Sequence, residues 1–214
     1  MKIIIDAYGG DNSPVEIVKG ALAALKEKEN FDIVLVGKEG GIKSVLAEEE
    51  YDTLRVSVVD ADEVIGCDET PTEAIRKKPD SSVVKCVKLL KEDENASAFV
   101  SAGSTGAVLT AAVLLSPRIK GVNRPALAPL LPNMKDGETL LLDCGANAEC
   151  TVEYLLQFAY LGSYYAQKVL GVENPRIGLL NIGAEESKSG FTPEETMQTA
   201  AKMAEYPHCH LKGL

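Results

Sequence analysis

The sequence has few cationic side chains and almost no histidine. Its 214 residues carry 22 Lys or Arg against 32 Asp or Glu, a net charge of −10, and 2 His. Broad nucleic-acid binding needs a basic face, so this balance argues against it. No apolar run approaches the roughly 20 residues that span a bilayer, so any membrane contact is expected to be peripheral at most.

Cysteine is present in an odd number, without any CxxC pair. The five residues are Cys67, Cys86, Cys144, Cys150 and Cys209. This pattern indicates neither a disulfide framework nor a zinc site and favours a reducing cytoplasm. No His precedes His208 to activate Cys144 as a nucleophile, so Cys144 is expected to be a small buried residue. No metal site is expected, and the chain opens directly on an expected strand, so no secretory signal is expected.

The sequence also lacks a G-x-G-x-x-G motif that follows an expected strand and has an acidic residue about 20 positions on. This absence disfavours a nicotinamide-dependent dehydrogenase. There is no internal repeat, no low-complexity stretch and no change of composition that would mark a linker. Strand-like and helix-like segments alternate throughout, which is typical of an α/β fold with a mainly parallel sheet. We expect one α/β domain over residues 1–214.

Apolar runs and helical periodicity predict the individual elements. Strands are expected over residues 2–6, 31–37, 55–59, 98–100, 139–143 and 176–181. Helices are expected over residues 81–91, 107–115 and 152–170, the second of them buried. Three more helices are expected to start at Ser13, Thr70 and Thr192, because each is followed directly by Pro and, three residues after the cap, by Glu.

Four expected strands run into polar loops that contain glycine. These loops cover residues 7–13, 101–107, 144–147 and 182–190. In an open parallel sheet, ligands bind beyond the carboxyl ends of the strands, so the four loops indicate one shared site. The loop 101–107 also precedes an expected helix, whose first N–H groups and dipole favour an anion. The alternative is an ordinary βα turn capped by Ser or Thr.

Five segments carry a family resemblance. They are Asp6–Asp11, Ser101–Ala107, Asn123–Ala128, Asp143–Asn147 and Leu180–Gly183. In this order and with these spacings they resemble the bacterial PlsX family, the acyl-ACP:phosphate acyltransferases of phospholipid synthesis. The resemblance implies a three-layer α/β/α fold related to isocitrate dehydrogenases and phosphotransacetylases. It also implies a reaction in which orthophosphate attacks the thioester of a fatty acyl-ACP, giving acyl phosphate and free ACP.

The resemblance further implies the setting of this reaction. Its partners would be acyl-ACP, orthophosphate and a downstream membrane glycerol-phosphate acyltransferase, without any cofactor, in a cytoplasmic homodimer. The family usually has Met where Tyr8 stands and Asn where Ser104 stands. Members of the family continue well past residue 214, so this chain corresponds to the N-terminal two-thirds of the family fold, with the C-terminal part absent.

Carried onto this chain, the reaction needs a phosphate cradle and groups that act on the reacting atoms. The expected phosphate-binding residues are Gly103, Ser104, Thr105, Gly106, Gly9 and Gly10. Lys188 is expected to neutralise phosphate charge, with a solvated loop lysine as the alternative. Asn147 is expected to donate to the developing oxyanion, and Asp11 is the carboxylate to test as a general base. Asp6 and Asp143 are expected instead to fix their loops by accepting N–H bonds.

An acidic chain needs local cationic patches to bind ACP, which is itself acidic. Two groups of residues meet this need: Arg76, Lys77 and Lys78, and Arg118, Lys120 and Arg124. The alternative for each group is a solvated helix end. Two other functions stay open at this point. One is a short-chain phosphate acyltransferase that uses acyl-CoA, and the other is an inactive fragment that binds phosphate or ACP without turnover.

Overall fold

The computed structural model describes residues 1–134, 137–147, 149–180, 198 and 202. The chain forms two compact units, Met1–Arg118 and Ile119–Leu214, and each is described by itself. The expectation of a single domain over residues 1–214 stays a prediction. In the described part of the chain, no helix is both long and apolar enough to cross a membrane.

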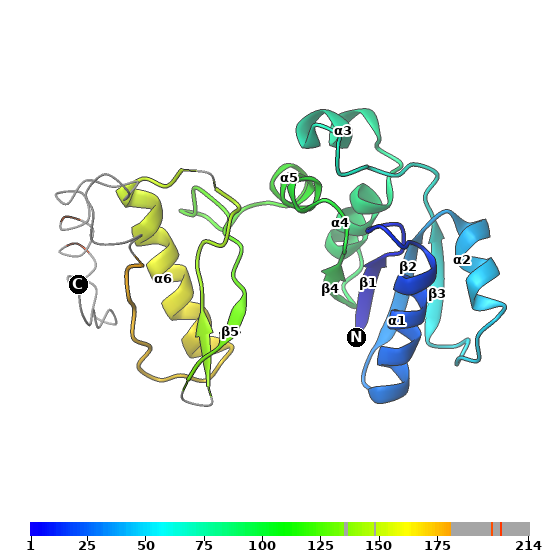
Figure 1. Ribbon diagram of the computed structural model, residues 1–214, viewed down its shortest axis with the longest axis horizontal. Coiled ribbons are helices and arrows are strands. Elements are labelled where there is room, and N and C mark those ends of the chain that lie inside the picture. The colour runs from blue at the N-terminus through cyan, green and yellow to red at the C-terminus, as the bar shows by residue number, and fades with distance from the viewer. Residues whose placement is uncertain (135–136, 148, 181–197, 199–201, 203–214) are drawn as a thin grey trace. The chain divides into compact units, whose positions relative to one another are not determined.

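The first unit is built on a four-stranded parallel sheet (Figure 1). Its strands are β1 (Lys2–Asp6), β2 (Asp32–Gly37), β3 (Val56–Asp60) and β4 (Ala96–Val100). The strand order is β3-β2-β1-β4, so β1 pairs with β2 on one side and with β4 on the other. All four strands were predicted from the sequence, and the parallel sheet is confirmed.

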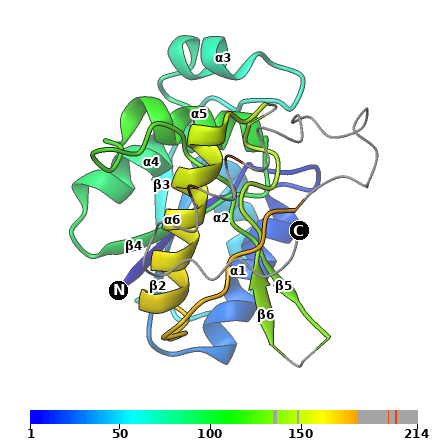
Figure 2. The same cartoon turned by 90° about the vertical axis from the view of Figure 1, so that its left-hand side faces the viewer.

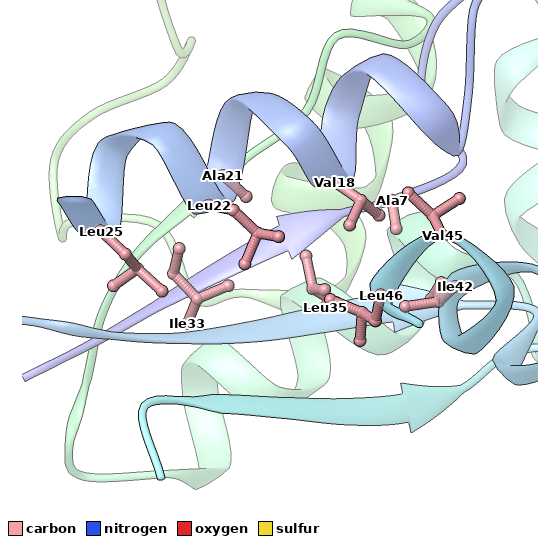
Figure 3. Packing of buried hydrophobic residues seen from close by; sticks show 10 residues of the cluster. All are labelled: Ala7, Val18, Ala21, Leu22, Leu25, Ile33, Leu35, Ile42, Val45 and Leu46. Atoms are coloured by element: carbon pink, nitrogen blue, oxygen red, sulfur yellow. The ribbon is translucent and has the colours of Figure 1, made fainter. Parts of the chain in front are cut away.

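One face of this sheet is covered by α1 (Val15–Glu27) and α2 (Glu39–Leu46). Strand β2 alternates between the two faces, and its residues Ile33 and Leu35 point to this side. Helix α1 meets them with buried residues at helical spacing, including Val18 and Leu22 (Figure 3). The result is a continuous apolar core under the first loop of the chain.

The other face is covered by α4 (Ser82–Glu92). Val34 and Val36, which alternate with the residues of the first face, pack here with Ile4 and Cys86. Helices α3 (Pro71–Lys77) and α5 (Thr105–Leu115) add a cluster around α4. Helices therefore lie on both faces, and the expected three-layer α/β/α architecture is confirmed.

The second unit contains an antiparallel hairpin and one long helix (Figure 2). Strands β5 (Leu130–Pro132) and β6 (Glu138–Leu140) pair with each other, and α6 (Val152–Lys168) follows. The strand expected over residues 139–143 is confirmed for residues 139–140 only, and its pairing is antiparallel because its partner is the segment just before it. The strand expected from residue 176 is wrong for residues 176–180, which have no regular structure.

The helix starts were predicted with mixed success. Thr70 is the cap residue of α3, as expected, with Pro71 in its first turn. Helix α1 begins one residue later than expected: Pro14 is its cap, and the Ser13 hydroxyl donates to the Tyr8 carbonyl at 3.3 Å. The helix expected to be buried is α5. It is buried at Ala107 and Ala111 but not throughout, because Leu114 is 49% exposed. The helix expected from residue 192 lies outside the described residues.

Candidate functional site

The carboxyl ends of β1 and β4 lie side by side at the edge of the sheet where the strand order changes direction. The two strands are parallel neighbours, with Ile5 opposite Val100. Strand β1 connects to β2 on one side, whereas β4 joins β1 from the other side. Such a switch point is where open α/β sheets bind ligands. The sequence predicted loops at both strand ends, and the structure brings these two loops together.

A buried carboxylate joins the two loops. Asp6 ends β1 and is 1% exposed. Its Oδ2 accepts the Ser101 hydroxyl at 2.7 Å, and its Oδ1 accepts the Tyr8 N–H at 3.2 Å. Ser101 in turn accepts the N–H of Gly103 at 3.1 Å. The expectation that Asp6 fixes its loop is confirmed, and Ser101 is its partner in the second loop.

The backbones of the two loops approach closely at a pair of glycines. A Cβ added at Gly9 would lie 2.6 Å from Asp6 Oδ2 and 2.9 Å from the Gly103 nitrogen. A Cβ added at Gly103 would lie 3.1 Å from the Gly9 Cα. Gly10 has a φ of +103°, which side chains rarely adopt. Glycine is therefore needed at these positions to bring the loops together, whatever else they bind.

Helix α5 starts within the second loop. The Ser104 hydroxyl oxygen accepts the N–H of Ala107 at 3.3 Å and so caps the helix, as an ordinary βα turn would. Among the residues that the structure describes, no acceptor is found for the N–H groups of Ser104, Thr105 and Gly106. These are the donors that a bound anion would meet. Thr105 is exposed beside them.

Gly106 has a packing role that the sequence did not reveal. A Cβ added there would lie 2.9 Å from the Pro71 Cγ, at the start of α3. The absence of a side chain thus lets α3 approach α5. Gly106 can still offer its N–H to a ligand, but close approach of a ligand is not the only reason for glycine at this position.

The loop after β6 is organised by Asp143. Its Oδ1 accepts the N–H groups of Leu127 at 2.7 Å and Ala146 at 3.2 Å, and its Oδ2 accepts the N–H of Asn147 at 2.8 Å. Burial acts to raise the pKa of Asp143, but these N–H donors and the Asn147 amide outweigh it and hold the pKa below its ordinary value. The expectation that Asp143 fixes its loop is confirmed.

Asn147 and Cys144 lie in this same loop of the second unit. The Asn147 amide nitrogen donates to the Pro125 carbonyl at 2.9 Å and to Asp143 Oδ2 at 3.1 Å, so both its hydrogens are engaged within the loop. This arrangement favours a loop-fixing role over donation to an oxyanion. Cys144 is exposed, so the expectation of a buried residue is wrong: the turn around Asp143 leaves its side chain on the surface.

The first expected ACP-docking group contains three differently placed cations. Arg76 is exposed, and Lys77 is 74% exposed while pairing with Glu73 at 2.7 Å. Lys78 is only 31% exposed: its Nζ donates to Glu69 at 2.7 Å and to the Val64 carbonyl at 2.8 Å. Lys78 therefore fixes the loop before α3, whereas Arg76 and Lys77 face solvent.

The second expected docking group spans the boundary between the two units. Arg118 ends the first unit, whereas Lys120 and Arg124 belong to the second. Arg118 and Lys120 are exposed. The Arg124 guanidinium lies over the Tyr154 ring, 5.6 Å from its centre, which holds this segment against α6.

The remaining expected site residues are placed as follows. Asp11 is exposed at the end of the first loop. Lys188 and the loop 182–190 lie outside the described residues, so the prediction that all four strand-end loops meet stays a prediction. In the part of the chain that is described, no group of three or more His, Cys, Asp or Glu could hold a metal ion.

Comparison of the structure with solved structures defines the class of fold. The structure of this chain is similar to that of a phosphotransacetylase from Streptococcus pyogenes. The TM-score is 0.67, with 17% identity over 98% of this chain and 67% of that one. It is also similar to a branched-chain phosphotransacylase from Enterococcus faecalis, with a TM-score of 0.63 and 20% identity over 100% of this chain and 68% of that one. The fold is therefore of the phosphotransacetylase type.

Comparison of the sequence identifies the family. The model of the family described as "Fatty acid synthesis protein" matches residues 1–213, and the chain belongs to this family. A protein of Dictyoglomus turgidum named phosphate acyltransferase is 48% identical over 92% of this chain and 58% of its own length. One of Fusobacterium nucleatum with the same name is 50% identical over 92% of this chain and 59% of its own length. The chain thus spans just under three-fifths of these relatives.

Proposed function

We propose that this chain is the phosphate-binding portion of an acyltransferase that moves a fatty acyl group from acyl-ACP to orthophosphate, for phospholipid synthesis. The observation that carries the proposal is the start of α5, beside the Gly9 and Gly10 loop at the switch point of the sheet. The first N–H groups of this helix have no acceptor among the described residues. The names of the relatives support the reaction class.

The proposed reaction needs little from the protein beyond positioning and charge stabilisation. A phosphate oxygen attacks the thioester carbonyl carbon, the C–S bond breaks, and the carrier leaves as a thiolate that takes up a proton. Phosphate dianion is already nucleophilic near neutral pH, so a strong base is not required. Backbone N–H groups can hold and orient the phosphate in a chain of net charge −10 without a cluster of cations.

The roles of individual residues follow from their contacts. The N–H groups of Ser104, Thr105 and Gly106, with the two hydroxyls, are proposed to bind phosphate, beside Gly9 and Gly10. Asn147 is proposed to hold its own loop, since its amide hydrogens are engaged there. Lys188 remains the proposed cation for phosphate charge, and Asp11 remains the carboxylate to test.

The partners and setting belong to the same proposal. Arg76 and Lys77, the solvent-facing cations of α3, are proposed to contact acidic ACP, and Lys120 is a second proposed contact. The proposal also includes a homodimer in the cytoplasm, with peripheral membrane contact at most. Its downstream partner is a membrane glycerol-phosphate acyltransferase.

Two specific observations favour alternative functions. The fold likeness to phosphotransacetylases favours transfer from a short-chain acyl-CoA to phosphate. The engagement of both Asn147 amide hydrogens within their own loop, away from an oxyanion, favours a chain that binds phosphate or ACP without turnover. The identity of the acyl donor and the need for phosphate separate these from the main proposal.

The test is an incubation of the 214-residue chain with palmitoyl-ACP and orthophosphate, with release of free thiol as the measurement. Matched reactions replace phosphate by sulfate, and palmitoyl-ACP by palmitoyl-CoA or acetyl-CoA. Thiol release that requires phosphate and prefers palmitoyl-ACP is the expected result. Preference for acetyl-CoA would favour the short-chain alternative. Phosphate binding without thiol release from any donor would favour the inactive fragment.

A further inference from the structure

Tyr8, the second residue after β1, packs its ring on the end of β2 and the first turn of α2. A Cβ added at Gly41, in the first turn of α2, would overlap the Tyr8 hydroxyl oxygen. A Cβ added at Gly37, the last residue of β2, would overlap the Tyr8 ring. The ring also packs against the apolar core under α1 and α2. Two glycines thus form the surface on which the ring lies.

The backbone of Tyr8 is fixed at the same time. Its N–H donates to Asp6 Oδ1 at 3.2 Å, and its carbonyl accepts the Ser13 hydroxyl at 3.3 Å. The next residue, Gly9, donates its N–H to the Asp6 carbonyl at 3.3 Å. Tyr8 is the residue directly before Gly9, so the backbone that carries its ring continues into the Gly9–Gly10 loop.

We propose that Tyr8 is a positioning residue that couples the first turn of α2 to the Gly9–Gly10 loop and thereby sets the affinity of that loop for phosphate. The phosphate part of this inference rests on the proposed function. An aromatic ring suits this role because it is large and has few rotatable bonds. A displacement of the loop by about 1 Å is enough to weaken a positioned interaction severely.

Two adjacent glycines of α2 allow a matched test. A Cβ at Gly41 would overlap Tyr8, whereas a Cβ at Gly40 would meet no described residue within 4 Å. Both Gly→Ala exchanges raise helix propensity similarly. We expect Gly41→Ala to shift the amide resonances of Gly9 and Gly10 in a ¹⁵N–¹H spectrum and to raise the KM for orthophosphate about tenfold, with a smaller change in kcat. Gly40→Ala is expected to do neither.

Variants of Tyr8 itself test the coupling without adding an overlap. Tyr8→Ala is expected to raise the KM for phosphate, and Tyr8→Phe, which keeps the ring, to restore most of the loss. In the Tyr8→Ala background, Gly41→Ala is expected to add no further loss, because the ring that it would displace is gone.

The outcomes separate this inference from the proposed function. Equal Gly9 and Gly10 resonances in Gly41→Ala and Gly40→Ala would overturn the coupling, as would an unchanged phosphate KM in Tyr8→Ala. If the unmodified chain neither binds nor uses phosphate, the proposed function fails. The resonance comparison still decides in that case whether Tyr8 positions the loop.

Discussion

The Ser101 hydroxyl donates to the Asp6 carboxylate at 2.7 Å and so joins the ends of two parallel strands that lie 95 residues apart in the sequence. A carboxylate that is 1% exposed must have donors, and Asp6 receives one from each of the two loops. The same Ser101 oxygen accepts the Gly103 N–H, directly before the α5 N–H groups that have no acceptor in the described part of the chain. The contact therefore holds both sides of the proposed phosphate site.

Removal of this contact is expected to affect both stability and phosphate use. Ser101→Ala leaves the buried Asp6 carboxylate with one donor fewer and frees the Gly103 N–H. Loss of a hydrogen bond to a buried charged group costs about 1–3 kcal/mol of unfolding free energy. We also expect the KM for orthophosphate to rise roughly tenfold, because the two loops lose their common anchor. Chemical denaturation and steady-state kinetics measure the two effects.

Ser57→Ala is the matched control for this variant. The Ser57 hydroxyl donates to the Ile33 carbonyl at 3.4 Å, on β3 and away from the switch point. Ser57→Ala removes the same atoms as Ser101→Ala. Because Ser57 lies away from the two loops, we expect a small loss of stability and an unchanged KM for phosphate. A phosphate KM in Ser101→Ala equal to that of Ser57→Ala would show that the Asp6 contact is structural only.

Gly9→Ala is expected to be among the most damaging single exchanges in the first unit. The added Cβ would lie 2.6 Å from Asp6 Oδ2 and 2.7 Å from Ser101 Oγ, so the two loops must separate. Overpacking of this kind costs about 1–3 kcal/mol, and phosphate binding should fall below detection. Isothermal titration with phosphate and thermal unfolding measure the outcome.

Gly20→Ala, in α1, provides the comparison for Gly9→Ala. In the part of the chain that the structure describes, a Cβ at Gly20 would meet nothing within 4 Å. The exchange should stabilise the chain by up to about 1 kcal/mol through helix propensity. Phosphate binding should be unaltered in this variant. Retained phosphate binding by Gly9→Ala would instead argue that the close approach of the loops is unnecessary.

The sequence predicted the first unit well because its signals are local. Alternating or continuous apolar residues marked all four parallel strands, and the expected polar strand ends at Asp6 and Ser101 met as predicted. The sequence pattern also predicted that Asp143 fixes its loop by accepting N–H bonds. The packing of Tyr8 and of Gly106 was missed, because each depends on a residue far along the chain, Gly41 and Pro71 respectively.

The errors also have physical causes. Residues near 139 have the apolar character of a parallel strand, but pairing direction depends on the partner, and here that partner is the adjacent β5. Ser13 was expected to cap α1, yet its hydroxyl donates to the Tyr8 carbonyl instead. The exposure of Cys144 could not be inferred from composition, since small residues are placed by the course of the backbone.

The different surroundings of the α3 cations allow a test of carrier docking. Arg76→Glu with Lys77→Glu reverses two solvent-facing charges, and we expect kcat/KM with palmitoyl-ACP to fall about tenfold or more. Turnover with palmitoyl-CoA should change less. The loss with ACP should diminish at high salt, because exposed charges are screened.

Lys78→Glu serves as the contrasting variant. Lys78 holds Glu69 and the Val64 carbonyl, so its reversal should lower the melting temperature and affect both acyl donors alike. Equal losses with ACP and CoA in the Arg76 and Lys77 double variant would contradict a docking role for this surface.

The network around Asp143 predicts a pH-dependent stability of its loop. Each carboxylate oxygen accepts two donors, so Asp143→Asn sets an NH₂ group against donors in either orientation. We expect a loss of about 1–3 kcal/mol in unfolding free energy at pH 7. The folded pKa of Asp143 is lowered, so its stabilisation is complete above the ordinary value of 3.8 and is lost as pH falls through the folded pKa. The difference between Asp143→Asn and the unmodified chain should therefore shrink in denaturation curves measured below about pH 4.

Asp62→Asn is the control for this variant. The described residues provide no donor to the exposed Asp62 carboxylate, so this exchange should change the unfolding free energy little at either pH. A deficit in Asp143→Asn that persists unchanged in acid would mean that the side chain acts through its shape and not through its charge.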